Sequence, residues 1–197
     1  GHPHFVGTID SFVSKYVATP FLTSMGFPPE RVDEEYALSW RERRVGKYGN
    51  DFWNNHPNTP LKEIKLTQVS RSEPFGEKLT SGNRIPGKAT PTYKEFARIY
   101  WQSIKSGILT HDEIFVFAQR ALEVCPEMGT AIRSRFPFVV IDEAQDCTAM
   151  RLDLLHQIFE VGGNESVVQR VGDPNQAIYS TAESTSSGTP KAAAAFP

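Results

Sequence analysis

The fold expected for this chain is decided by residues 136–146, which read Phe-Pro-Phe-Val-Val-Ile-Asp-Glu-Ala-Gln-Asp. The apolar part of this stretch does not alternate with polar residues, which is typical of a strand buried on both faces of a sheet. Two acidic residues, Asp142 and Glu143, follow the apolar run directly. Ligands of open α/β sheets lie beyond the carboxyl ends of the strands. The pattern therefore predicts a buried strand that presents two carboxylates at the ligand edge of a sheet.

A second strand is predicted roughly 30 residues further on, a length that fits one strand–helix–strand unit. Residues 148–161 have helical apolar spacing, and residues 166–171 form another apolar run. That run ends in the segment 172–176, Gly-Asp-Pro-Asn-Gln. We therefore expect an α/β core in which the ends of two parallel strands lie side by side.

The first 26 residues are predicted to form a short strand at 5–8 and then a helix capped by Asp10 or Ser11. Residues 27–91 are heavily punctuated by Pro, Gly and Asn, which indicates a small insert with two or three strands. Helical spacing returns afterwards. The predicted strands of the insert are 36–40 and 64–69, and the predicted helices after it are 92–106, 111–125 and 126–135.

Composition excludes several classes of protein. A net charge of −2 argues against a globally basic nucleic-acid binder, so contact with DNA would need a local patch. Cys125 and Cys147 form no Cys-x-x-Cys pair, which argues against a zinc site or disulfide scaffold and favours an intracellular location. No apolar run approaches the ~20 residues that span a bilayer, and no signal peptide is visible. No membrane partner is expected.

The two strand ends carry residue types suited to nucleotide hydrolysis. Asp142 would hold Mg²⁺ through its water shell, and Glu143 would orient and deprotonate the attacking water. Gln176 would contact the terminal phosphate or that water and so sense hydrolysis. Simpler interpretations stay open, because two acids can merely end a strand and cap the next helix, and Asp-Pro-Asn is common in turns.

Two segments together resemble motifs II and III of superfamily 1 helicases of the UvrD/Rep class. They are 140–146, Val-Ile-Asp-Glu-Ala-Gln-Asp, and 171–179, Val-Gly-Asp-Pro-Asn-Gln-Ala-Ile-Tyr. A third segment, 6–12, resembles the Thr-x-His-Ser-Phe motif that contacts single-stranded DNA in that family, although Asp10 stands where His is usual. The resemblance implies a partial RecA-like (P-loop NTPase type) parallel sheet, with ATP and Mg²⁺ as cofactors.

The same resemblance implies a set of nucleic-acid-binding residues. Thr8 and Ser11 would contact the phosphates of single-stranded DNA through their hydroxyls, with Asp10 between them, and Tyr179 would lie near the DNA bases. Ordinary structural roles remain open for each: Asp10 or Ser11 as a helix cap, and Tyr179 as a core residue. The expected partners are single-stranded and duplex DNA and a second motor domain of the same protein.

The sequence also departs from the family pattern. No Gly-x-x-x-x-Gly-Lys-Ser/Thr loop precedes Thr8, and residues 82–89 do not supply one, because Ala89 replaces the hydroxyl and no strand is expected before Gly82. After Tyr179 comes Ser-Thr-Ala-Glu instead of the usual aromatic and arginine. We therefore expect a fragment of a helicase motor that does not hydrolyse ATP by itself.

A basic and aromatic stretch in the insert, 40–48, has two interpretations. It reads Trp-Arg-Glu-Arg-Arg-Val-Gly-Lys-Tyr, which suits a nucleic-acid surface. A solvated charged strand or loop is the more common meaning of such a run.

The function expected from the sequence is ATP-driven translocation on single-stranded DNA with duplex unwinding, carried out by the intact protein. A non-catalytic helicase-like module that binds DNA or protein is the alternative, and an unrelated α/β nucleotide hydrolase is a third. The expected domains are the start of a RecA-like core at 1–26, an accessory insert at 27–136 (strand- and loop-rich at 27–91, helical at 92–136), the rest of the core at 137–180, and a flexible tail at 181–197.

Overall fold

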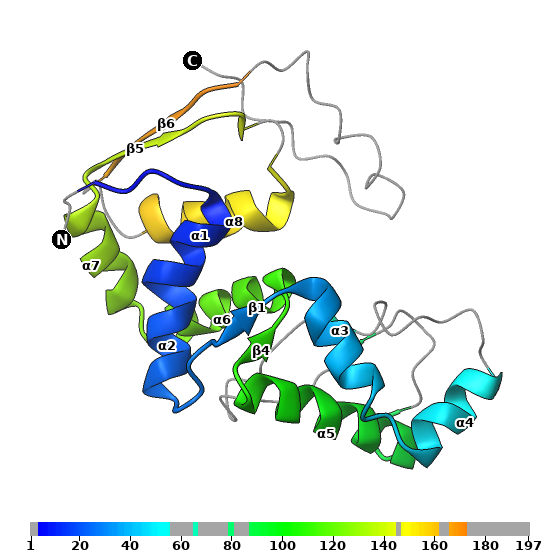
Figure 1. The fold of residues 1–197 in the computed structure, drawn as a ribbon. Helices are drawn as coiled ribbons and strands as arrows, with labels where there is room; N and C mark the ends of the chain where they lie inside the picture. The colour runs from blue at the N-terminus through cyan, green and yellow to red at the C-terminus, as the bar shows by residue number, and fades with distance from the viewer. Residues whose placement is uncertain are drawn as a thin grey trace.

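The computed structural model describes residues 4–55, 65–66, 79–80, 87–144, 147–161 and 166–172. It contains a strand–helix–strand unit, labelled β5, α8 and β6 in Figure 1. Strand β5 (Phe138–Ile141) pairs in parallel with β6 (Val167–Arg170), and helix α8 (Ala149–Phe159) connects them. The register places Ile141 opposite Arg170, so both strands end at the same level. The predicted strand–helix–strand unit is confirmed.

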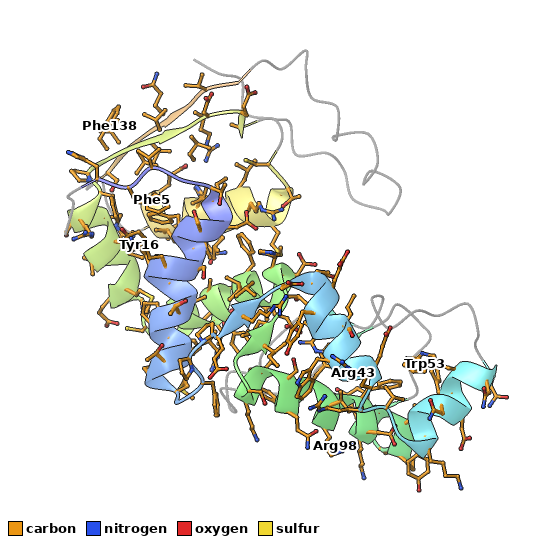
Figure 2. The ribbon with its side chains drawn as sticks, in the orientation of Figure 1. Phe5, Tyr16, Arg43, Trp53, Arg98 and Phe138 are labelled. Atoms are coloured by element: carbon orange, nitrogen blue, oxygen red, sulfur yellow. The ribbon has the colours of Figure 1, made fainter. Side chains whose placement is uncertain are left out.

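The prediction that β5 is buried on both faces is wrong for the structure described. Phe138 is 61% exposed and Val140 is 53% exposed, whereas Ile141 is buried. Figure 2 shows Phe138 on the side of the strand that faces away from the helices. The helices around α8 pack on the opposite side of the β5–β6 pair, so the strand has one buried face and one open apolar face.

The N-terminal segment is helical from residue 9 onward. Helix α1 (Ile9–Val13), the π-helix η1 (Ser14–Ala18) and α2 (Thr19–Ser24) follow one another with helical backbone at each junction. The predicted helix is confirmed, but its cap is Thr8 instead of Asp10 or Ser11. The predicted strand at 5–8 is absent, because Phe5 packs its ring against Phe12 and Tyr16.

The helices expected after the insert are confirmed within a residue or two. They are α5 (Pro91–Lys105), α6 (His111–Val124) and α7 (Glu127–Arg135). Thr110 and Glu113 form a capping box at the start of α6. Along the residues that the structure describes, no helix combines the length and the apolar character needed to cross a bilayer.

Residues 27–91 contain short strands, as predicted, but also two helices that were not expected. Residues 36–40 lie in α3 (Glu34–Glu42), which is followed by α4 (Lys47–Asn55). The strand predicted at 64–69 is present as β2 (Lys65–Leu66), which pairs antiparallel with β3 (Leu79–Thr80). One more short pair, β1 (Arg31–Val32) with β4 (Ile108–Leu109), is parallel.

Polar contacts that the apolar pattern does not show fix the two unexpected helices. The Asp33 side chain accepts a hydrogen bond from the Tyr36 backbone N–H and so caps α3. Glu95 of α5 accepts hydrogen bonds from the backbone N–H groups of Gly46 and Gly49, at 2.8 and 3.0 Å. Its carboxylate therefore holds the positive end of α4 against α5.

Two hydrophobic clusters form the interior. The larger one combines residues of α1, η1, α2, α5, β4, α6, α7 and α8 with Ile141 of β5. The rings of Phe12 and Phe159 meet in it with centroids 5.7 Å apart, so α1 packs beside α8. The smaller cluster joins α4 and α5 through Phe52, Tyr93, Phe96, Ala97 and Tyr100.

A buried ion pair connects α3 to α5 and α6. The Arg41 side chain is 1% exposed and donates to Glu113 Oε2 at 2.8 Å and to Ser103 Oγ at 3.1 Å. Its guanidinium also lies over the ring of Tyr100, 4.1 Å from the centroid. Burial, the largest influence, raises the pKa of Tyr100 well above its usual range. Arg41 therefore supplies a charge-assisted link among three helices.

A second ion pair joins α1 to α8. Arg151 Nη2 donates to Asp10 Oδ1 at 2.8 Å and Arg151 Nε donates to Asp10 Oδ2 at 3.1 Å, which makes a two-pronged fork. The hydrogen bond from Arg151 is the largest of the influences on the pKa of the Asp10 carboxyl, which lies below its usual value of 3.8. The fork therefore stabilises the ionised form of Asp10 and ties together helices that begin 140 residues apart.

Replacing Glu113 with Gln should lower the free energy of unfolding by about 3–5 kcal/mol, because the buried Arg41 guanidinium loses its counter-charge. Glutamine can still serve in the capping box, so the change isolates the charge. Urea unfolding followed by circular dichroism measures the effect. The double variant Arg41→Met, Glu113→Gln should recover at least half of the loss, since no charge then stays buried. A loss below about 1 kcal/mol in the single variant would show that this pair does not hold the helices together.

The Asp10–Arg151 fork should add an acid-sensitive part to stability. A folded-state pKa below the unfolded value means that the contribution is fully present above about pH 5 and is lost as the pH falls past 3.8 through the folded pKa. Because the pair is partly exposed, its contribution should be about 1 kcal/mol or less. Unfolding titrations of wild type and Asp10→Asn from about pH 6 to pH 2 should show a shallower acid slope in the variant. Equal slopes of stability against pH in wild type and Asp10→Asn would show that the fork adds no acid-sensitive stability.

Candidate functional site

The N-terminal motif places two hydroxyls at the start of α1. Thr8 Oγ1 accepts a hydrogen bond from the Ser11 backbone N–H at 3.1 Å and donates to Ser11 Oγ at 3.1 Å. Ser11 Oγ in turn donates to the Thr8 carbonyl oxygen at 2.8 Å. Both residues are exposed, while Phe12, directly after them, is buried in the larger cluster. The core thus fixes the helix and leaves the hydroxyl pair at the surface.

The carboxylate segment follows β5 directly. Asp142 and Glu143 are both exposed, and Asp142 Oδ1 accepts a hydrogen bond from the Glu143 backbone N–H at 3.0 Å. Glu143 has a φ of +50°, and it is the one non-glycine residue with positive φ among those described. Such a backbone typically costs about 1–3 kcal/mol and is most frequent at functional sites.

Hydrogen bonds to the end of β6 hold this turn in place. The Val171 N–H donates to the Ile141 carbonyl at 2.8 Å, and the Ala144 N–H donates to the Val171 carbonyl at 3.0 Å. The backbone of Asp142 and Glu143 is therefore bracketed by two bonds to one residue of the neighbouring strand. The expectation that the two strand ends lie side by side is confirmed.

Two of the predicted site residues, Gln176 and Tyr179, lie outside the described residues. The structure describes the segment before them as far as Gly172, which follows the end of β6 next to the end of β5. Of the remaining predictions, Thr8, Asp10 and Ser11 share one turn of α1, and Asp142 and Glu143 share the turn after β5.

The fit of the site to a magnesium ion depends on Asp142. Magnesium usually keeps several of its waters and takes only one or two protein carboxylates. An exposed aspartate at a strand end therefore suits a hydrated Mg²⁺ brought in with phosphates. Within the described ranges, no three His, Cys, Asp or Glu side chains gather closely enough to hold a metal ion by themselves.

The basic and aromatic stretch 40–48 spans the end of α3 and the start of α4, so it is not a charged strand. Arg41 is buried, and the guanidinium of Arg44 lies 3.5 Å from the ring centroid of Trp40. Arg43 is exposed and donates to the Ser39 carbonyl oxygen. Figure 2 shows Arg43 on the same arm of the molecule as Trp53 and Arg98. Part of the apparent charge of this stretch is thus used inside the fold.

One residue of the site area escapes sequence reasoning. Arg151 binds Asp10 across a separation of 141 residues, and no local spacing indicates such a partner. The single signal in the sequence is Asp10 itself, an acid in a short stretch between Thr8 and Ser11.

Comparison with known proteins gives two matches. The model of the UvrD/REP helicase N-terminal domain matches residues 37–195. The chain is also similar to the RecBCD enzyme subunit RecB of Haemophilus influenzae, with 24% identity over 193 aligned residues. That alignment covers 78% of this chain and 16% of the RecB subunit, so the chain spans about a sixth of the length of this curated relative. Since the family match extends over well more than half of the residues, the chain belongs to the UvrD/REP helicase N-terminal domain family.

Proposed function

We propose that the chain is part of the first motor domain of an ATP-dependent DNA helicase, which couples ATP hydrolysis to movement along single-stranded DNA and to duplex unwinding. The observation that carries the proposal is the β5–α8–β6 unit, which presents Asp142 and Glu143 at the carboxyl edge of two parallel strands. Family membership supports the same reaction class. The RecA-like character of the sheet is part of this proposal, as is the division into core and accessory insert.

The carboxylates have distinct proposed roles. Asp142 holds the hydrated Mg²⁺ that accompanies the nucleotide, and Glu143 orients the attacking water and accepts its proton. ATP, when bound, supplies the phosphoryl group that is transferred to water. Gln176 follows β6 in sequence and is proposed to contact the terminal phosphate or the water, which would link hydrolysis to movement.

The N-terminal motif is proposed to bind single-stranded DNA. The hydroxyls of Thr8 and Ser11 are exposed, and by exchanging their hydrogen bonds to Ser11 Oγ and to the Thr8 carbonyl oxygen they can donate to phosphate oxygens without reading base sequence. Tyr179 is proposed to stack on a base. The isolated chain should not hydrolyse ATP, because its sequence has no loop of the Gly-x-x-x-x-Gly-Lys-Ser/Thr type to cradle the triphosphate. The activity belongs to the complete helicase, whose second motor domain is a further proposed partner.

Changing Glu143 to Gln in the complete helicase should reduce DNA-stimulated ATP turnover by about 100-fold or more, because an amide cannot accept the proton of the attacking water. The substitution keeps the size and backbone of the residue, so binding of ATP should be retained. Turnover and the affinity for a fluorescent ATP analogue measure the two effects separately.

Glu42→Gln is the matched control for this experiment, since it removes an exposed carboxylate on α3. Full turnover is expected in the control. Turnover by Glu143→Gln equal to that of wild type would refute the role of Glu143. A wild-type protein without any ATP turnover would instead favour a non-catalytic DNA- or protein-binding module.

Changing Ser11 to Ala should weaken binding of an oligothymidylate by about 10-fold or more, since a hydrogen bond to a charged group contributes about 1.5–3 kcal/mol and each ~1.4 kcal/mol is tenfold in affinity. The slope of log affinity against log salt concentration should stay the same, because a neutral hydroxyl releases no counterions. Fluorescence anisotropy at several salt concentrations gives both quantities.

Ser24→Ala serves as the control, since Ser24 Oγ donates to the Phe21 carbonyl at 2.7 Å at the other end of the same helical segment. It loses a comparable hydrogen bond without touching the N-terminal motif. Equal DNA affinities of the two variants would argue against contact at Ser11.

A further inference from the structure

The Asp10–Arg151 fork joins the two motifs on which the proposed function rests. Asp10 lies in the first turn of α1, between the hydroxyls of Thr8 and Ser11. Arg151 lies in the first turn of α8, the helix that follows the Asp142–Glu143 segment. The Arg151 side chain is 27% exposed and the Asp10 side chain is 30% exposed. In the Arg31–Asp33 pair, by comparison, the arginine side chain is 52% exposed.

Arg151 also has contacts on the α8 and α6 sides of the fork. Its Nη1 donates to Oγ1 of Thr148, the N-cap residue of α8, at 3.4 Å. Its guanidinium lies 5.1 Å from the ring centroid of Phe115 on α6. With both aspartate oxygens, a cap hydroxyl and an aromatic ring around it, the guanidinium is fixed in direction, which a planar fork allows and a flexible ammonium does not.

The path from Arg151 to the proposed catalytic turn is short. Thr148 is only five residues after Glu143 in the chain. Next to it, the Cys147 thiol donates a weak hydrogen bond to the Glu143 carbonyl oxygen, with a sulfur–oxygen distance of 4.0 Å. Glu143 has the positive φ described above, so a small shift at the start of α8 reaches a residue whose backbone is already strained.

The chemistry of Asp10 argues against direct contact with DNA. A carboxylate repels phosphate, and both of its oxygens accept hydrogen bonds from Arg151. A phosphate held by the flanking hydroxyls of Thr8 and Ser11 would lie near this ion pair. Arg151 can offset the repulsion between that phosphate and Asp10, and in doing so its own position becomes sensitive to the presence of DNA.

We propose that Asp10 and Arg151 are positioning residues that couple single-stranded DNA at Thr8 and Ser11 to the Asp142–Glu143 turn. This inference rests on the proposed function and adds a physical route between its two sites. DNA bound at α1 shifts the position of the Arg151 guanidinium. That position determines the conformation of the first turn of α8, which in turn determines where the Glu143 side chain points. Arg151 touches neither nucleotide nor DNA in this scheme.

The decisive experiment compares ATP turnover of the complete helicase with and without saturating oligothymidylate, in wild type and in Arg151→Gln. Turnover without DNA should change less than DNA-stimulated turnover in the variant, and it is measured for each protein as the reference for the ratio. The ratio of DNA-stimulated to DNA-free turnover should fall at least 5-fold, the lower end of typical coupling between sites. Arg151→Lys keeps the charge but not the fork, and its ratio should lie between those of wild type and Arg151→Gln.

Arg31→Gln is the matched control, because Arg31 pairs with Asp33 at 2.8 Å and lies in the β1–β4 pair, on a different sheet from the catalytic turn. It should keep the wild-type ratio. Thermal unfolding of every variant checks that the protein is folded, and Arg151→Lys supplies the comparison if Arg151→Gln is not.

A second readout distinguishes coupling from a merely structural role. Binding of a non-hydrolysable ATP analogue should change the affinity of wild type for oligothymidylate, since coupling between two binding sites is reciprocal. In Arg151→Gln this change should be largely lost. A loss of stability alone would not remove it from the folded fraction.

Two negative results have different meanings. If wild type shows no DNA-stimulated turnover, the proposed function fails and the coupling fails with it. If wild type is stimulated and Arg151→Gln keeps the same ratio at saturating DNA, the coupling is overturned while the helicase assignment stands, even if more DNA is needed for saturation.

Discussion

The parallel pairing of β5 with β6 is the constraint on which the rest of this structure depends. Parallel strands need a crossover, and α8 supplies it, so the helix must lie against the face of the pair that becomes the core. With Ile141 opposite Arg170, the chain leaves both strands at one edge. The two hydrogen bonds of Val171 then hold the turn that contains Asp142 and Glu143. Residues held by the backbone of two strands are positioned more precisely than residues held by loops alone.

Around this unit the protein uses charged side chains to reinforce contacts between helices. Glu95 holds the start of α4, Arg41 and Glu113 link α3 to α6, and Asp10 and Arg151 link α1 to α8. The three contacts differ in burial and therefore in consequence. The Arg41–Glu113 pair is fully buried, so losing one partner leaves an unpaired buried charge. The Asp10–Arg151 fork is partly exposed, so losing it costs less stability.

The helices between residues 91 and 135 were predictable because their apolar residues recur at helical spacing. In α6, Thr110 with Glu113 is also a local start signal. Residues 36–40 were predicted as a strand but form part of α3. This helix begins at the Asp33 cap and is held in place by the buried Arg41, and neither contact is visible in the apolar spacing. Sequence reasoning treated Arg41 as one of several surface charges, since burial of a charge depends on a partner 72 residues away.

By itself, the sequence determined the strand–helix–strand order, the position of the acidic pair directly after an apolar run, and the hydroxyl motif before a helix. These follow from short-range spacing, which the backbone geometry of helices and strands converts directly into structure. Only the tertiary structure decided that one face of β5 stays open, that Glu143 has a left-handed backbone, and that Asp10 has Arg151 as its partner. Those features arise from contacts between residues far apart in the chain, and such contacts exist only once the packing of α1 against α8 brings the two segments together.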